Sequence, residues 1–241
     1  MSNGCGGSEM SELSNYAFAP EPIPTLPVSG SDRRFPIHRI YCVGRNFADH
    51  AIEMGHDPSR EPPFFFQKNP DSILLSGNDF PYPGETHDVH HEIELVVALH
   101  KGGSNIAVET ALDHVFGYAV GLDMTRRDLQ GEAKKLGRPW ETAKAFEKSA
   151  PCTGIRPVCE VGHPGAGAIW VKVNGEVRQS GDLDQMIWKV PEMISYLSRL
   201  FELKPGDLIF AGTPAGVGAI KPGDDIFGAI DGVGEIRTRV V

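Results

Sequence analysis

The stretch that decides the fold is "HDVHHEIELVVAL", residues His87 to Leu99. Its side chains alternate as in a β-strand, in which successive residues point to opposite faces. One face is apolar and carries Ile93, Leu95, Val97 and Leu99. The other face places Glu92 beside Glu94, next to His90, before it turns apolar. A strand this rich in valine and leucine is expected to be buried, so something must hold two repelling carboxylates together there.

A hard divalent cation would do this, because it prefers oxygen ligands and offsets the repulsion. The stretch "VGLDMTRRD" offers a third oxygen ligand, Asp123, at the end of an apolar strand. Carboxylates without paired cysteines favour Mg²⁺ or Mn²⁺ over Zn²⁺. The alternatives are a solvated strand face, or glutamates that are satisfied by lysine and arginine. His90 fits a structural or supporting role better than that of a metal ligand.

Composition limits the class of protein. The chain has 241 residues, 40% of them hydrophobic, and a net charge of -9, which argues against nucleic-acid binding by bulk electrostatics. No apolar run approaches the roughly 20 residues of a membrane span, and the N-terminus lacks the pattern of a signal peptide, so we expect a cytoplasmic protein without membrane contact. The four cysteines form no CxxC pair and predict no zinc site; they are Cys5, Cys42, Cys152 and Cys159.

Two regions follow each other along the chain. Residues 1–37 begin with a Gly/Ser-rich leader and continue as "APEPIPTLPVSGSD", whose prolines exclude helix and central strand. We expect a disordered leader and then an extended arm that lies on the domain or on a partner subunit. Residues 38–241 are expected to form the folded domain, beginning with the apolar strand in "RIYCVG".

Short strands and 28 glycines predict a β-rich α+β domain rather than a βαβ repeat. Strands are expected at 39–43, 62–68, 87–100 and 116–122, and Asn174-Gly175 marks the type I′ turn of a hairpin. Helices are expected in "RNFADHAIEMG", near Val108, in "RRDLQGEAKKLG" up to Gly137, and in "VPEMISYLSRLF". The tail from 207 on reads as short strands between Gly and Pro turns.

A second candidate group is His50 with Glu53, which lie three residues apart and so on one face of the expected helix. A carboxylate beside an imidazole fixes its tautomer and raises its basicity, as removal of a proton from water requires. A surface pair is the alternative, because His-x-x-Glu occurs by chance in many helices.

Cations set among apolar residues form a third group: Lys68, Arg127 and Lys144. On an acidic chain they indicate local anion binding, with lysines that merely reach to solvent as the alternative. The stretch "GTPAGVG" lacks the GK[ST] of a P-loop and predicts no nucleotide site, although it could present Thr213 to a small anion.

Taken together these stretches resemble the fumarylacetoacetate hydrolase family, specifically its short acylpyruvate hydrolase branch. The matching segments run in the family's order from about Arg39: "YCVGRNFADHAIEMG", "FFFQKNPDSIL", "HHEIEL", "GYAVGLDMTRRDLQ", "GRPWETAKAFEKSAP", "VNGEVRQSG" and "GDLIFAGTPAGVG". The resemblance implies a mixed β-roll with flanking helices and a homodimer. From the resemblance we expect the Pro-rich arm in place of the extra N-terminal domain of the longer family members.

The resemblance also implies a role for each site residue. Glu92, Glu94 and Asp123 match the positions that bind Mg²⁺ or Mn²⁺. His50 and Glu53 match the water-activating pair, and Lys144 matches the catalytic lysine near metal and substrate. The positions that match or fit substrate binding are Arg45, Lys68, Arg127, Gln130 and Thr213. Lys68 departs from the family pattern Lys-Pro-Ser, because Asn69 separates it from Pro70.

The implied reaction is metal-dependent hydrolysis of the C–C bond of an acylpyruvate, a small anionic 2,4-dioxo acid. The stretch "YAFAPEPIPTLPVSGSDRRFPIHRIYCVGRNFADHA" resembles fumarylpyruvate hydrolases of the bacterial gentisate pathway of aromatic degradation, which implies cleavage of fumarylpyruvate to fumarate and pyruvate. Maleylpyruvate and acetylpyruvate are alternative substrates. Oxaloacetate decarboxylation, isomerisation or hydration of dienoates, and a non-catalytic metal-binding protein are alternative functions on the same fold.

Overall fold

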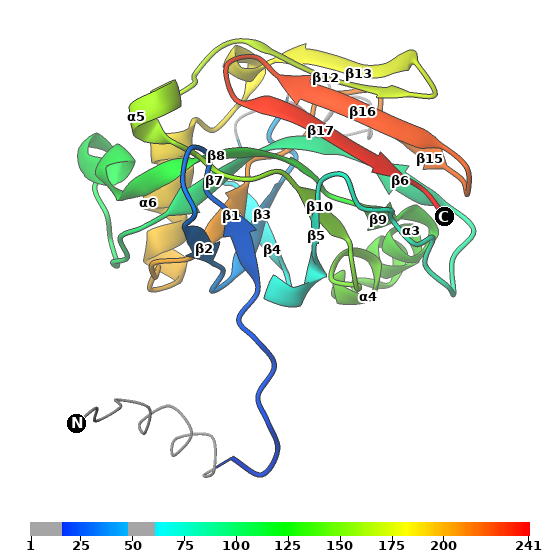
Figure 1. Ribbon diagram of the computed structural model, residues 1–241, viewed down its shortest axis with the longest axis horizontal. Coiled ribbons are helices and arrows are strands. Elements are labelled where there is room, and N and C mark those ends of the chain that lie inside the picture. Colours follow the sequence, from blue (N-terminus) through cyan, green and yellow to red (C-terminus); the bar gives the residue numbers. More distant parts are fainter. Residues whose placement is uncertain (1–15, 48–60) are drawn as a thin grey trace, which may run out of the picture.

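The computed structural model describes residues 16–47 and 61–241, and its centre is a large, curled sheet (Figure 1). The strands of this sheet, in spatial order, are β4 (Phe64–Lys68), β3 (Ile40–Gly44), β14 (Leu208–Phe210), β7 (Ile93–Leu99), β8 (Val115–Leu122), β10 (Ala150–Cys152) and β5 (Ile73–Leu75). β11 (Arg156–Pro157) also pairs with β8. β3 with β14 and β5 with β10 are parallel pairs among antiparallel ones. This mixed, β-rich sheet confirms the predicted α+β class.

A second sheet lies across the first one, at the top of Figure 1. Its antiparallel strands, in spatial order, are β13 (Glu176–Asp182), β12 (Ala168–Val173), β16 (Asp225–Ile230) and β17 (Gly234–Arg239). The predicted hairpin turn is confirmed, since Asn174 and Gly175 adopt φ angles of 52° and 83° between β12 and β13. A small sheet of β15 (Gly218–Ile220), β6 (Val89–His91) and β9 (Thr125–Arg126) adjoins it.

Strand β7 separates two apolar cores, as its alternating sequence requires. Ile93, Leu95, Val97 and Leu99 enter the core that the large sheet shares with the second sheet and helix α6 (Val190–Leu200). Val96 and Ala98 enter a smaller core on the opposite face. Because Glu92 and Glu94 share this second face, they continue the row of Val96 and Ala98 beyond the apolar part.

The remaining helices are short. They are η2 (Pro70–Ser72), η3 (Val108–His114), α3 (Arg127–Leu136), α4 (Glu141–Lys144), α5 (Val158–Val161) and η4 (Leu183–Gln185). The predicted helix end at Gly137 is confirmed, because Gly137 adopts the left-handed conformation at the C-terminus of α3. The helix expected near Val108 is the 3₁₀ helix η3. Within the described ranges, no helix has the length and apolar character needed to cross a membrane.

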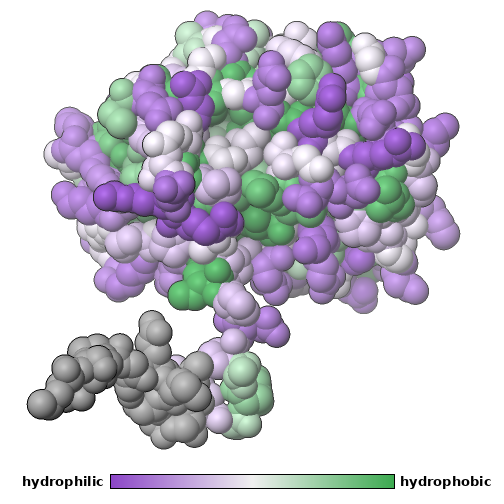
Figure 2. Space-filling model, in the orientation of Figure 1, coloured by the Kyte–Doolittle hydropathy of each residue, from purple (hydrophilic) through white to green (hydrophobic). Residues whose placement is uncertain are grey.

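The end of the N-terminal arm forms a β-hairpin, which the prolines in its sequence did not lead us to expect. β1 (Thr25–Pro27) pairs with β2 (Arg34–Pro36), and Leu26 and Phe35 are buried in the smaller core. Before this hairpin the chain extends away from the body (Figure 1), and three large apolar side chains are exposed there: Tyr16, Phe18 and Ile23. The predicted contact with a partner subunit stays a prediction. On the visible face of the body, hydrophobic residues are scattered among hydrophilic ones (Figure 2).

The strand expected at 87–100 is two strands that meet at a corner. β6 pairs with β9 and β15, whereas β7 pairs with β8 and β14, and Glu92 lies between β6 and β7. The different partners on either side bend the chain at this residue. Consequently one of the two glutamates lies at the corner and the other lies inside the sheet.

Candidate metal centre and substrate cleft

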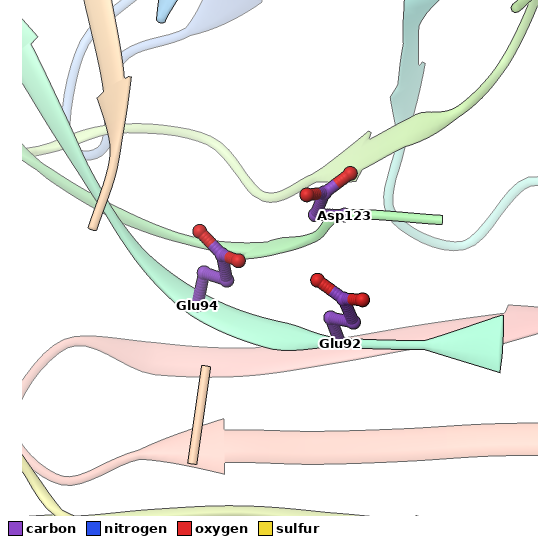
Figure 3. Close-up of side chains that lie close together, drawn as sticks. All are labelled: Glu92, Glu94 and Asp123. Carbon is purple, nitrogen blue, oxygen red and sulfur yellow. The ribbon is translucent and has the colours of Figure 1, made fainter. Parts of the chain in front are cut away.

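Three carboxylates meet at the corner between β6, β7 and the end of β8. One oxygen or more from each of Glu92, Glu94 and Asp123 lies within 4.8 Å of the others, and all three residues are buried. Figure 3 shows their carboxylates turned toward a common point. The Asp123 N–H donates to the Glu92 carbonyl oxygen over 2.8 Å, which fixes the end of β8 against the corner. The predicted cluster is therefore present.

Two lysines compensate part of this negative charge. The Lys144 ammonium, at the end of α4, lies 2.9 Å from Glu92 Oε2 and 2.6 Å from Asp123 Oδ2 and donates to Thr125 Oγ1 over 2.6 Å. Lys68 Nζ lies 2.8 Å from Asp123 Oδ1 and donates to the carbonyl oxygens of Met124 and Lys144. Burial lowers the pKa of Lys144, but the charges of Asp123 and Glu92 outweigh it, so the net shift is upward and this lysine stays protonated.

Glu94 is the carboxylate that the protein compensates least. Its Oε2 accepts from the Gly212 N–H over 2.8 Å, and no cation of the described residues lies within ion-pair distance of it. Burial, and then the charges of Asp123 and Glu92, raise the pKa of Glu94 well above its usual value. A divalent cation between the three carboxylates would remove this penalty.

The donor set fits a divalent metal that prefers oxygen. All three groups are carboxylates, and Asp123 Oδ1 is buried without a hydrogen-bond partner among the described residues, although the charge of Lys68 is close to it. Three protein ligands leave positions open for substrate or water, an arrangement that suits Mg²⁺ or Mn²⁺. The residues present therefore fit the predicted cofactor.

Glycine at position 212 is required by the approach of two loops behind Glu94. Gly212 has a φ of 93°, and a Cβ there would lie 2.7 Å from the Cβ of Asn46. Asn46 itself is buried, and its side chain bonds the backbone of Trp188 and Ala211. The "GTPAGVG" stretch therefore brings a backbone N–H to a candidate metal ligand, as a glycine-lined turn can.

Arg127 closes the cluster from the first turn of α3. Its guanidinium pairs with Glu92 Oε1, donates to Gln130 Oε1 over 2.7 Å, and donates through Nε to His90 Nδ1 over 3.3 Å. His90 Nε2 then lies 2.9 Å from Asp88 Oδ1. Burial, and then the charge of Arg127, lower the pKa of His90, in keeping with a neutral ring that accepts from arginine. His90 thus supports Arg127, as the sequence suggested.

Thr213 is held by a network that the sequence did not reveal. Its hydroxyl donates to the Ile93 carbonyl oxygen over 2.7 Å and accepts from Gln179 Nε2 over 2.8 Å. Gln179 Oε1 also accepts from the Ile93 N–H and lies 2.9 Å from His91 Nδ1. Because the hydroxyl hydrogen of Thr213 is committed, its predicted contact with substrate oxygens would need another donor of this residue or a rearrangement.

An open cleft leads to the cluster. The residues that line it include the three carboxylates together with Val43, Gly44, Arg45, Phe64, Phe66, Arg127, Gln130, Lys134, Trp140, Lys144 and Thr213. Sequence reasoning assigned no role to Lys134, Trp140, Phe64 or Phe66, although the last three stand in the segments "GRPWETAKAFEKSAP" and "FFFQKNPDSIL" that carry the family resemblance. The signal for Lys134 was its spacing, since residues 127, 130 and 134 recur on one helix face.

One predicted residue lies apart from the cleft, and two others lie outside the described residues. Lys68 is fully buried and does not line the cleft, so its ammonium supports Asp123 from behind instead of facing a substrate. The binding of Lys68 to three partners in the protein explains this position. His50 and Glu53, and with them most of the helix expected in "RNFADHAIEMG", lie outside the described residues. Their predicted role in activating water stays a prediction.

Known proteins resemble the chain over most of its length. The chain is 56% identical to the fumarylpyruvate hydrolase of Pseudomonas aeruginosa, whose crystal structure holds Mn²⁺ and pyruvate, with a TM-score of 0.92 over 94% of this chain and 99% of that one. It is 45% identical to a fumarylpyruvate hydrolase of a Ralstonia species, over 76% of this chain and 95% of the relative. It is 44% identical to a mitochondrial oxaloacetate tautomerase of Rattus norvegicus, over 83% and 90%.

These relatives act on different oxo acids but share one fold. The family model for the fumarylacetoacetate (FAA) hydrolase C-terminal region matches residues 39–241, which include every residue of the cluster and the cleft. The chain belongs to the fumarylacetoacetate hydrolase family.

Proposed function

We propose that this protein is a metal-dependent acylpyruvate hydrolase that converts fumarylpyruvate and water to fumarate and pyruvate. The observation that carries the proposal is the cluster of Glu92, Glu94 and Asp123 at the bottom of a cleft with Lys144 and Arg127 in its wall. The similarity to two fumarylpyruvate hydrolases supports the choice of substrate.

Mg²⁺ or Mn²⁺ held by Glu92, Glu94 and Asp123 would bind the 2-oxo carboxylate end of the substrate and act as a Lewis acid there. The Mn²⁺ in the Pseudomonas aeruginosa structure supports this assignment. Lys144 keeps the carboxylates of Glu92 and Asp123 in place, and its positive charge stabilises negative charge that develops on the substrate. Arg127 does the same beside Glu92.

The reaction needs a base, a broken C–C bond and a proton for the new methyl group. His50, oriented by Glu53, takes a proton from water, and the oxygen forms a bond to the C4 carbonyl carbon of the substrate. The C3–C4 bond then breaks, and its electron pair remains on C3 as the enolate of pyruvate. C4 becomes a carboxylate carbon of fumarate, and protonation of C3 releases pyruvate.

Oxaloacetate is the second candidate substrate. The identity of 44% to an oxaloacetate tautomerase favours it, and reactions of both oxo acids pass through an enol or enolate beside a carboxylate. The two candidates differ in their need for a water-activating base, because neither decarboxylation nor tautomerisation of oxaloacetate consumes water. Substitution of His50 therefore separates them.

A spectrophotometric assay tests the proposal. The loss of the enol absorbance of fumarylpyruvate is followed with Mg²⁺ or Mn²⁺, beside maleylpyruvate, acetylpyruvate and oxaloacetate. We expect metal-dependent loss of fumarylpyruvate that Glu94→Gln and His50→Ala both abolish, while Glu132→Gln on the exposed side of α3 serves as the control. Turnover of oxaloacetate alone, undiminished in His50→Ala, would contradict the proposal.

The proposed substrate also indicates a metabolic pathway for this protein. We infer a place in aromatic degradation of the gentisate type, in the cytoplasm, with a homodimer as the working form. Size measurement in solution tests the homodimer.

A further inference from the structure

Two cations in the wall of the cleft have no anionic partner in the part of the chain that the structure describes. Among the described residues, no hydrogen bond or ion pair involves the ammonium of Lys134 or the guanidinium of Arg45, and both side chains line the cleft. In contrast, the three other cationic side chains around the cluster each pair with a carboxylate; these are Lys68, Arg127 and Lys144. A charge kept without a partner in a cleft is a candidate for binding a ligand of opposite charge.

These two cations lie against a pair of packed aromatic rings. Lys134 Nζ lies 5.1 Å from the centre of the Trp140 ring, and Arg45 Cζ lies 5.4 Å from the centre of the Phe64 ring. The two rings themselves pack edge to face, with centres 5.3 Å apart. Such contacts contribute about 0.5–1 kcal/mol at exposed sites and provide no hydrogen-bond acceptor. The aromatic pair therefore positions the cations without neutralising them.

The position of Lys134 on helix α3 explains why its ammonium serves a ligand rather than the carboxylate cluster. Arg127, Gln130 and Lys134 are spaced i, i+3 and i+7, so they follow one helix face away from the metal ligands. Arg127, at the start of this face, bonds through each of its three guanidinium nitrogens, to Glu92, Gln130 and His90. Lys134 lies about two turns further along, where the described residues offer no acceptor.

We propose that Lys134, with Arg45, forms an anion subsite that binds a carboxylate at the far end of the acyl group. This inference rests on the proposed function and sharpens it, because it defines the substrate class as acylpyruvates whose acyl group ends in a carboxylate. Fumarylpyruvate belongs to this class and acetylpyruvate does not. Lys134 is thus a specificity residue that binds the part of the substrate that does not react.

The electrostatics of Lys134 agree with this role. Burial, and then the charges of Arg127 and Arg45, lower the pKa of Lys134 to about 8. The charges of Glu92 and Lys144 also act on it, in opposite directions. A neighbouring cation makes a second cation unfavourable, and a carboxylate placed between the two removes that cost. The arrangement therefore favours an anion over an apolar group of the same size.

Calorimetry with a matched pair of ligands tests the subsite without turnover. Fumarate and crotonate have the same carbon skeleton, but crotonate carries a methyl group in place of the second carboxylate. Each is titrated into the Mn²⁺-loaded full chain in wild type, Lys134→Met, Lys134→Arg and the control Lys135→Met, whose side chain lies on the exposed side of the same helix. Circular dichroism verifies the fold of each variant.

We expect wild type to prefer fumarate over crotonate by about tenfold, as a charge-assisted hydrogen bond allows. The preference should vanish in Lys134→Met and persist in Lys134→Arg and Lys135→Met. In steady-state assays, Lys134→Met should raise the KM for fumarylpyruvate about tenfold and leave that for acetylpyruvate unchanged.

Two results would overturn the subsite: no fumarate preference in wild type, including failure of both acids to bind, or an undiminished preference in Lys134→Met. The proposed function fails separately, if the wild-type enzyme hydrolyses no acylpyruvate. A fumarate preference that depends on Lys134 would then still establish the anion subsite.

Discussion

The two ends of the cleft differ in how their charges are balanced. At the metal end, the carboxylates of Glu92 and Asp123 pair with three cations, whereas Glu94 contacts no cation among the described residues. At the far end, Lys134 and Arg45 lie beside aromatic rings with no anion in contact among the described residues. The metal end therefore lacks positive charge at one carboxylate, Glu94. The far end has positive charge that no anion of the described residues neutralises.

This difference indicates what each end binds. A buried charge that lacks a partner is costly, so a protein that keeps one is expected to meet its partner as a ligand. We therefore expect the metal end to bind a cation and the far end to bind an anion. Substitutions at each end should therefore change different properties of the protein.

Glu94→Gln should have the largest effect, because it removes the carboxylate that the described residues compensate least. We expect Mn²⁺ affinity, measured by calorimetry, to fall by about 100-fold or more, which corresponds to about 2.7 kcal/mol. Saturating Mn²⁺ should raise the Tm of wild type and leave that of the variant nearly unchanged. Equal Mn²⁺ affinity in both proteins would show that the metal binds elsewhere.

Lys144→Met tests the interlocking of charges at the metal end. Loss of the ammonium leaves the buried carboxylates of Glu92 and Asp123 with less compensation, at a cost of about 3–5 kcal/mol in the free energy of unfolding without metal. Urea denaturation measures this cost, with Lys135→Met as the exposed control. Added Mn²⁺ should recover part of the loss. A change below about 1 kcal/mol would be that of a surface ion pair and would contradict the account.

Arg127→Met separates the metal end from the far end. Among the described residues, Arg127 pairs with Glu92 and not with the far end of the cleft, Lys134 and Arg45. Its loss should therefore lower kcat/KM for fumarylpyruvate and acetylpyruvate by the same factor, about 10- to 100-fold. Lys134→Met should affect fumarylpyruvate alone. A selective effect of Arg127→Met on fumarylpyruvate would assign the distal carboxylate to this arginine instead.

The pH dependence gives the smallest effect. Because burial lowers the pKa of Lys134 to about 8, its ammonium loses a proton as the pH rises through that value, and the far end then loses one charge. We expect the preference for fumarate over crotonate to be complete below pH 8 and to decline severalfold above it. Lys134→Arg should show no decline, since arginine stays charged. An unchanged preference up to pH 10 in wild type would contradict the role of Lys134.

The sequence predicted the metal end better than the far end. Glu92 and Glu94 alternate with a fully apolar face, so the period of a strand alone placed both carboxylates on one side of β7. Asp123 followed from the end of the next strand. Lys134 and Trp140 stand in no such pattern: they approach the cleft only because the loop after α3 returns to β4, a contact between distant segments.

The corner at Glu92 and the hydrogen-bond network around Gln179 could not be predicted from the sequence either. A strand that changes sheets has the same local alternation as a straight one, so 87–100 was predicted to be continuous although it is broken at Glu92. Gln179 reaches Thr213 and His91 across the second sheet, and no spacing in the chain indicates it. Local periodicity determines which face of a strand a residue lies on, whereas the pairing and packing of the sheets determine which side chains it contacts.

The most direct test of the central claim follows the oxygen of water into the products. Fumarylpyruvate is incubated with the Mn²⁺-loaded enzyme in ¹⁸O-labelled water, and the products are analysed by mass spectrometry. The account predicts one ¹⁸O atom in each fumarate, on the carboxylate formed from C4, together with an equal amount of pyruvate. Fumarylpyruvate that is consumed without labelled fumarate, through isomerisation or loss of CO₂, would contradict hydrolysis at this metal centre.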